Sequence, residues 1–165
     1  MRERILRPAG LVSIQPDYAW QEIPGRAIGY ERDRGVVKRS SDTDVSWKLG
    51  AGGFVSDIRD FAGYAKALID RRFVSEKTQA QMWRRQRLQS GDETNWGLGF
   101  EVDDKGGHLR VAHSGKQEKT RTRLVIYPRD RLGAVVMTNS EWVDPVRIST
   151  SVFAALKRTD SALGE

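Results

Sequence analysis

The spacing of apolar residues changes twice along the chain, from irregular to helical and then to alternating, and these changes divide the chain into three segments. In residues 1–46, prolines and glycines interrupt every apolar run, which predicts a loop-rich N-terminal segment. Within it, a short helix is expected over residues 2–6, and a small hairpin is expected to pair residues 27–30 with 35–38. Residues 47–94 are predicted to be a helical segment, and residues 95–165 an antiparallel sheet followed by a C-terminal helix.

Two helices are predicted in the middle segment. Between residues 57 and 70, apolar side chains recur at spacings of three and four, which places them on one stripe of an amphipathic helix with Ser56 as its N-cap. The stripe comprises Ile58, Phe61, Ala62, Ala65, Leu68 and Ile69. A second helix is expected to begin after Ser75 and to turn Met82 and Trp83 inward.

In the last segment the spacing changes to two, which is typical of half-buried strands. Four stretches show it: residues 96–102, 109–113, 121–127 and 132–138. Short turns at 103–107 and 128–131 favour antiparallel hairpins. Asp144 and Pro145 then mark the start of a helix that is expected to turn Ile148, Val152, Phe153 and Leu156 toward the sheet. The predicted fold class is α+β: a three- to four-stranded antiparallel sheet with helices packed on it.

Composition narrows the picture further. A length of 165 residues with 38% apolar content suits one domain, and the absence of cysteine excludes disulfides and thiolate zinc sites. No apolar run is long enough for a membrane helix, so no membrane partner is expected, and the compartment stays undetermined. The net charge of +6 raises the question of nucleic acid. The basic residues are mixed with acids at the ends of predicted elements, which favours solvated faces, with residues 116–131 as the alternative nucleic-acid surface.

The run His113-Ser114-Gly115 carries the strongest candidate chemistry. A histidine at the end of a strand is often merely satisfied by its neighbours. Here, however, Ser114 and Gly115 follow where bulky side chains would pack better, and a glycine in a strand permits close approach of another backbone or a ligand. Backbone N–H groups on such an edge can hold an extended peptide-like substrate or a developing oxyanion. The other histidine, His108, is expected on the opposite face, so neither a metal nor a cofactor is expected.

A series of short motifs, in order, resembles the C-terminal part of the serine β-lactamase and penicillin-binding-protein-like hydrolases, especially their class C and carboxylesterase branch. The motifs are Arg7-Pro-Ala-Gly-Leu11, Ala51-Gly-Gly-Phe-Val-Ser56, Trp96-Gly-Leu-Gly-Phe100, His113-Ser-Gly115, Arg123-Leu-Val-Ile-Tyr-Pro128 and Val135-Val-Met-Thr-Asn-Ser140. The resemblance runs from about Glu3 over nearly the whole chain. It implies a partial β-lactamase/transpeptidase-like fold and an ancestry in the hydrolysis of β-lactams, esters or D-amino-acid peptides.

The resemblance also implies roles for single residues. His113, Ser114 and Gly115 match the family's third motif, which lines the substrate, and the N–H of Lys116 would help to bind the oxyanion. The chain contains no Ser-x-x-Lys and no Tyr-x-Asn, so no catalytic residue is assigned. We therefore expect a truncated hydrolase that is inactive alone and takes a small-molecule or peptide substrate only when complete. The side chains of Lys116 and Lys119 are expected to crowd the groove.

A second hypothesis is a stand-alone, non-catalytic domain for binding or assembly. The strand predicted over Leu132–Thr138 would have a bare edge without the upstream strands of the family's sheet, and bare edges recruit partners. The expected partner is a second copy of the chain or the missing N-terminal half.

Overall fold

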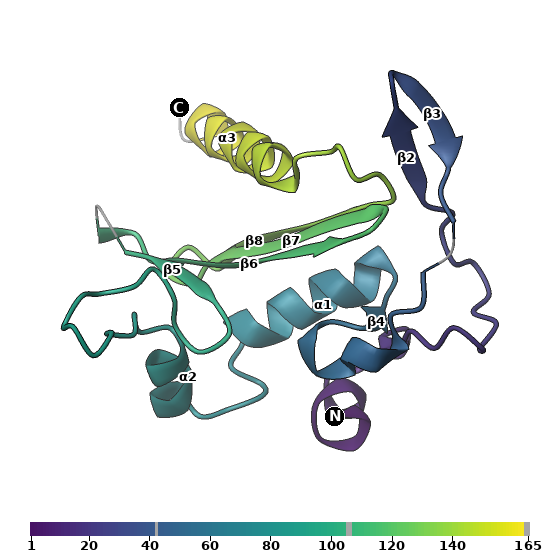
Figure 1. The fold of residues 1–165 in the computed structure, drawn as a ribbon. Helices are drawn as coiled ribbons and strands as arrows, with labels where there is room; N and C mark the ends of the chain where they lie inside the picture. The colour runs from purple at the N-terminus through teal and green to yellow at the C-terminus, as the bar shows by residue number, and fades with distance from the viewer. Residues whose placement is uncertain (42, 105–106, 164–165) are drawn as a thin grey trace.

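A four-stranded antiparallel sheet forms the centre of the computed structural model, which describes residues 1–41, 43–104 and 107–163, with side chains as far as Leu156. Its strands are β5 (Glu101–Asp103), β6 (Arg110–Gln117), β7 (Thr120–Tyr127) and β8 (Leu132–Thr138), in the order β5-β6-β7-β8. Helix α1 (Ile58–Ile69) covers one face and helix α3 (Pro145–Leu163) the other (Figure 1). The predicted α+β class and strand number are confirmed.

The main core lies between the sheet and α1. Val111 on β6 pairs with Ile126 on β7, and both side chains are fully buried. Leu124, Val102, Ala65 and Leu68 complete this side of the sheet, because alternate residues of a strand share a face. Helix α2 (Glu76–Met82) adds Trp83 to the same cluster, as predicted, and begins with the Ser75 hydroxyl accepting from the Thr78 N–H.

The register of α1 differs slightly from the prediction. Its N-cap is Asp57 rather than Ser56, since the Asp57 carboxylate accepts from the Asp60 N–H at 2.8 Å. Ile58 and Ala62 do not face the core, and Ile58 is 48% exposed. The buried residues of α1 are Ala65, Ala67 and Leu68, with Phe61, Tyr64 and Ile69 packed against the same core, so the buried stripe is narrower than the apolar pattern.

Helix α3 begins as predicted, with the Asp144 carboxylate accepting from the N–H groups of Val146 and Arg147. Only Phe153 of the four expected apolar residues is buried, where it packs on Ala112 and Val125. Ile148, Val152 and Leu156 remain about 40% exposed, so the prediction that they face the sheet was wrong. The buried residues of α3 are instead Pro145, Ser149 and Phe153, which follow each other at a spacing of four along one side of the helix.

The N-terminal segment wraps around one end of α1. A π-helical turn (Arg2–Leu6) and a 3₁₀ turn (Arg7–Ala9) lead into a small cluster made by Leu6, Leu11 and Ile14. The two-residue strand β1 (Gln15–Pro16) pairs with β4 (Phe54–Val55), which follows a 3₁₀ stretch over Ser46–Ala51. These contacts tie the loop-rich segment to the helical one.

The predicted N-terminal hairpin exists, but it is shifted. Its strands are β2 (Tyr30–Asp33) and β3 (Val36–Arg39), joined by a turn at Arg34 and Gly35, both with positive φ. The base of this hairpin is fixed to the end of the central sheet, since the Tyr30 N–H donates to the Asn139 carbonyl at 2.8 Å. Figure 1 shows the hairpin standing clear of the sheet beyond β8.

Two strand predictions need correction. Residues 96–100 are not a strand, because Gly97 packs against the Met82 carbonyl and Gly99 has a φ of 80°, so pairing starts only at Glu101. Strand β6 does not stop at His113 but continues to Gln117. The turn predicted at 103–107 lies partly outside the described residues. Strand β8 matches its prediction, and within the described ranges it has β7 as its only strand neighbour along its length.

No helix in the described part of the chain is long and apolar enough to cross a membrane.

Candidate functional site

The candidate site follows the second half of β6. Strand β5 pairs only with Arg110–Ala112, which we call the inner half of β6. The outer half, His113–Gln117, pairs with β7 alone, and the residues that the structure describes place no strand on its other side. Backbone groups along that edge are therefore free to pair with an extended ligand.

A cleft of about 1040 Å³ lies against this outer half. Its walls come from three places: β6 and its neighbours on the sheet, Phe61 and Tyr64 of α1, and the loops around Arg26 and Gly52. Burial raises the pKa of the Tyr64 phenol, which keeps this group protonated at neutral pH. The four residues expected at the site, His113, Ser114, Gly115 and Lys116, all lie along this cleft.

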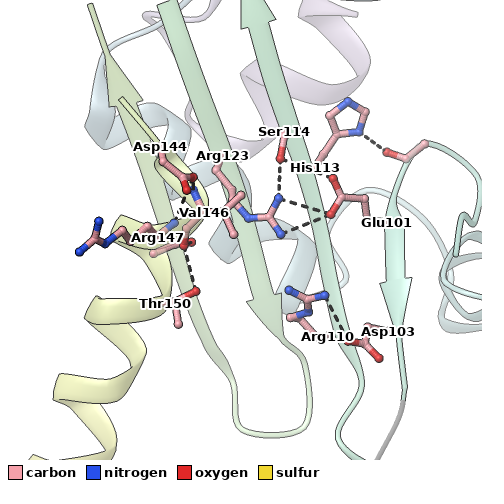
Figure 2. Close-up of polar contacts among 12 residues, drawn as sticks. Glu101, Asp103, Arg110, His113, Ser114, Arg123, Asp144, Val146, Arg147 and Thr150 are labelled. Carbon is pink, nitrogen blue, oxygen red and sulfur yellow. Dashed lines mark hydrogen bonds and ion pairs between the residues drawn. The ribbon is translucent and has the colours of Figure 1, made fainter. Parts of the chain in front are cut away.

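His113 is held by a backbone contact. Its Nδ1 lies 2.6 Å from the Gly99 carbonyl oxygen (Figure 2). The ring stands edge-on to Trp96, at 5.9 Å between centroids. Because a carbonyl oxygen can only accept, Nδ1 carries the proton and donates. The lone pair of the neutral ring is then on Nε2, which is the nitrogen available to an incoming group.

Ser114 faces the opposite side of the sheet, in a polar network that crosses three strands. Its hydroxyl accepts from the Arg123 guanidinium and lies 3.4 Å from a carboxylate oxygen of Glu101 (Figure 2). Both terminal nitrogens of Arg123 also lie 3.3 Å from the other Glu101 oxygen. Arg123 is only 3% exposed, so this ion pair and hydroxyl satisfy a buried charge. The network fixes Ser114 as part of the sheet.

Gly115 has a local structural reason to be glycine. A Cβ at this position would lie 2.2 Å from the hydroxyl of Thr122, its partner on β7. The side chain of Thr122 thus occupies the space beside Gly115 on the cleft face of the sheet. This contact explains the close approach that the glycine in the strand indicates.

Among the described residues, none of the serine hydroxyls hydrogen-bonds a histidine or lysine side chain. The Ser13 and Ser56 hydroxyls lie 3.5 Å from each other, and Asp57 and Asp60 beside them cap backbone N–H groups. An activated serine needs an adjacent base. In the part of the chain that the structure describes, the cleft therefore holds no serine hydroxyl paired with a histidine or lysine base. Within the described ranges no three acidic, histidine or cysteine side chains gather as a metal would require.

An antiparallel sheet between helices, with a His-Ser-Gly strand along an open cleft, is the architecture of the penicillin-recognising serine hydrolases. The match to a family model agrees with this, since residues 1–157 match the beta-lactamase family. The chain belongs to the beta-lactamase family.

Several known proteins are similar to this chain. A Bacillus subtilis (strain 168) protein assigned as a penicillin-binding protein, PbpX, is 26% identical over 102 residues, which are 62% of this chain and 25% of that protein. The octameric penicillin-binding protein homologue from Pyrococcus abyssi superposes with a TM-score of 0.77 at 23% identity, covering 94% of this chain and 36% of that chain. A D-amino acid amidase from Ochrobactrum anthropi SV3 gives 0.75 at 18%, covering 98% and 52%.

The chain thus spans about half or less of the length of these relatives. The structural neighbours show the fold. The matches support a β-lactamase-like family with hydrolases among its structural neighbours.

Sequence reasoning missed two features of the site. One is the partnership of Arg123 with Glu101, although the place of Glu101 between Phe100 and Val102 was a signal for it. The other is the burial of Lys119, which lines the cleft as expected but is 91% buried, with its stem against Gly29. The side chain of Lys116 is exposed, as expected for an edge strand.

Proposed function

We propose that this chain supplies the substrate-side wall of a serine hydrolase site that acts on amide, ester or β-lactam carbonyls. The observation that carries the proposal is the open outer half of β6, His113–Gln117, along a cleft in a chain of the beta-lactamase family. An extended substrate would lie antiparallel to this half-strand, and its carbonyl oxygen would face the backbone N–H of Lys116.

His113 would serve this wall in a defined way. Its Nδ1 is bound to the Gly99 carbonyl, so the Nε2 side of the ring would meet the substrate or a group that reacts with it. Ser114 would act indirectly, since its hydroxyl is bound to Arg123 and Glu101 and holds the strand in register. Lys116 would contribute its N–H, with its exposed side chain in solvent.

The nucleophile would come from a polypeptide segment outside these 165 residues. The sequence contains no Ser-x-x-Lys, and no described serine hydrogen-bonds a histidine or lysine side chain, so we expect no acyl intermediate on this chain. D-Amino acid amides are a natural choice of substrate for a first test, because two neighbours in structure are a D-stereospecific amidohydrolase and a D-amino acid amidase.

The test compares turnover with covalent labelling. The isolated chain is incubated with nitrocefin, a p-nitrophenyl ester and D-phenylalanine amide, and its intact mass is then measured. We expect no turnover above buffer and no acyl adduct. An adduct on any serine of this chain would overturn the assignment of the nucleophile to another segment.

The edge of β8 suggests how a partner would join. We propose that a strand of a second copy, or of the segment that carries the nucleophile, pairs along Leu132–Thr138. The half-exposed apolar side chains of Ile148, Val152 and Leu156 on α3 would add buried area beside it. That one neighbour in structure is an octamer supports self-association in this fold.

Light scattering over a range of protein concentrations tests this partner. Strand pairing predicts a molar mass that rises above that of the 18.7 kDa chain as concentration increases. A strictly monomeric species at high concentration would exclude self-association through β8.

A further inference from the structure

Lys119 has an unusual position in the turn that joins β6 to β7. Glu118 and Lys119 form this two-residue turn, and Lys119 has a φ of 65°, in the left-handed region that favours glycine. Its side chain is 91% buried, although lysine is almost never buried without a partner. A lysine in this place destabilises the fold in two ways, through its left-handed backbone conformation and through the removal of water from its side chain.

The aliphatic stem of Lys119 is fixed by the segment that it covers. A Cβ on Gly29 would lie 2.5 Å from the Lys119 Cβ and 2.7 Å from its Cδ, so the stem lies directly on the Gly29 backbone. That backbone is itself anchored, because the Ile28 carbonyl accepts from the Asn139 side chain at 2.8 Å and the Gly29 carbonyl from the Ser40 N–H at 3.0 Å. The stem of Lys119 is therefore held at a defined place as far as Cδ.

The ammonium group of Lys119 has no hydrogen bond or ion pair with the residues that the structure describes. It is also not among the fully enclosed polar atoms that lack a partner, so it reaches accessible space. Lys119 lines the cleft, and the accessible space beside it is the cleft. Of the other cleft cations, Arg26 is paired with Asp17, Lys48 lies over the Trp47 ring, and Lys116 is exposed.

We propose that Lys119 binds a carboxylate of the substrate at the hairpin end of the cleft, which deepens the proposed function and rests on it. A single ammonium suits a monoanion, and Glu118 next to it, held by the Thr43 hydroxyl at 2.5 Å, disfavours a dianion such as phosphate. The four-residue step from His113 to Gln117 spans about 13 Å at ~3.3 Å per residue. A peptide-like ligand along the outer half of β6 would therefore reach Lys119 with a carboxylate about three residues from the ligand group that lies beside His113.

The experiment measures binding of acetyl-tri-D-alanine, as its free acid and as its C-terminal amide, to the full chain by amide chemical-shift titration. We expect the free acid to bind at least tenfold more tightly than the amide. In Lys119→Met, which keeps the stem on Gly29, that preference should disappear. In Lys48→Met, the matched control with the same loss of charge at another residue that lines the cleft, it should remain.

Lys119→Arg keeps the charge and should retain most of the preference, which separates charge from folding if Lys119→Met is unstable. Equal affinity of the wild-type chain for acid and amide would overturn the proposal, as would equal loss of the preference in Lys119→Met and Lys48→Met. Binding of the amide with shifts along His113–Gln117 would still support the proposed function in either case. If neither ligand binds, the proposed function fails together with the role of Lys119.

Discussion

The two halves of β6 have opposite environments, although they belong to one strand. The inner half, Arg110–Ala112, has a strand on each side and places Val111 and Ala112 in two cores on the two faces of the sheet. The outer half, His113–Gln117, has β7 on one side and lines the cleft. Apolar burial determines the first half, while hydrogen bonds and one ion pair determine the second. The core of the sheet and the candidate site thus depend on different interactions, although both involve the same strand, β6.

The largest effect is expected in the inner half. Ile126→Ala removes a fully buried side chain opposite Val111 and should lower the free energy of unfolding by about 2–5 kcal/mol. Thr122→Ala on the same strand, facing the cleft, should cost less than about 1 kcal/mol. Urea unfolding of both variants measures this difference. Equal losses would mean that the two halves do not differ in packing.

The next effect concerns the network that holds the outer half. Glu101→Ala leaves the guanidinium of Arg123 buried without its carboxylate, and should cost about 3 kcal/mol. In the double variant Glu101→Ala with Arg123→Met, the buried charge is gone, and much of the loss should be recovered. A denaturation cycle over the four proteins measures the coupling. Strict additivity would show that the ion pair does not stabilise the sheet.

A smaller effect is expected at Gly115. Gly115→Ala places a Cβ against the Thr122 hydroxyl and should cost about 1–3 kcal/mol through crowding. Adding Thr122→Ala should relieve most of it, because the contact that would be too close is then absent. Thermal unfolding of the single and double variants decides this. If the second substitution brings no recovery, the glycine is needed for another reason, such as approach of a ligand.

The smallest effect depends on pH and lies at the packed end of the sheet. Hydrogen bonds from Lys66 and from Arg131, the latter at 2.6 Å, lower the pKa of Asp70 below its usual value of 3.8. A lowered pKa means that Asp70 stabilises the fold above pH about 4, and that this contribution is lost as the pH falls through the folded-state pKa. Asp70→Asn should flatten the fall in melting temperature between pH 5 and 2, and an unchanged profile would contradict it.

Much of the fold follows from the sequence because apolar periodicity reports packing. Strand β8, helix α2 with Trp83, and the start of α3 at Asp144 match their predictions. The failures occur where other forces decide. Residues 96–100 alternate like a strand, yet the close approach of Gly97 to the Met82 carbonyl and the positive φ of Gly99 turn the chain instead. On α3, apolar side chains extend beyond the surface that the sheet can cover.

The candidate site is harder to predict than the fold, since its geometry depends on contacts between distant residues. The His-Ser-Gly motif marks the strand, but not which side chains face the cleft. Ser114 is held by Arg123 from β7 and Glu101 from β5, and Lys119 is buried by Gly29, which lies 90 residues away in the chain. No local pattern reports such pairs.

The most direct test of the substrate-side wall is an amide chemical-shift map of the isotope-labelled chain during titration with acetyl-D-phenylalanine amide, a neutral ligand. We predict that the largest shifts fall on His113–Gln117 and on Gly99, whose carbonyl holds the His113 ring, with β8 and α3 unchanged. Shifts concentrated on β8 or α3, or no shifts at millimolar ligand, would contradict the assignment of the outer half of β6 as the binding wall.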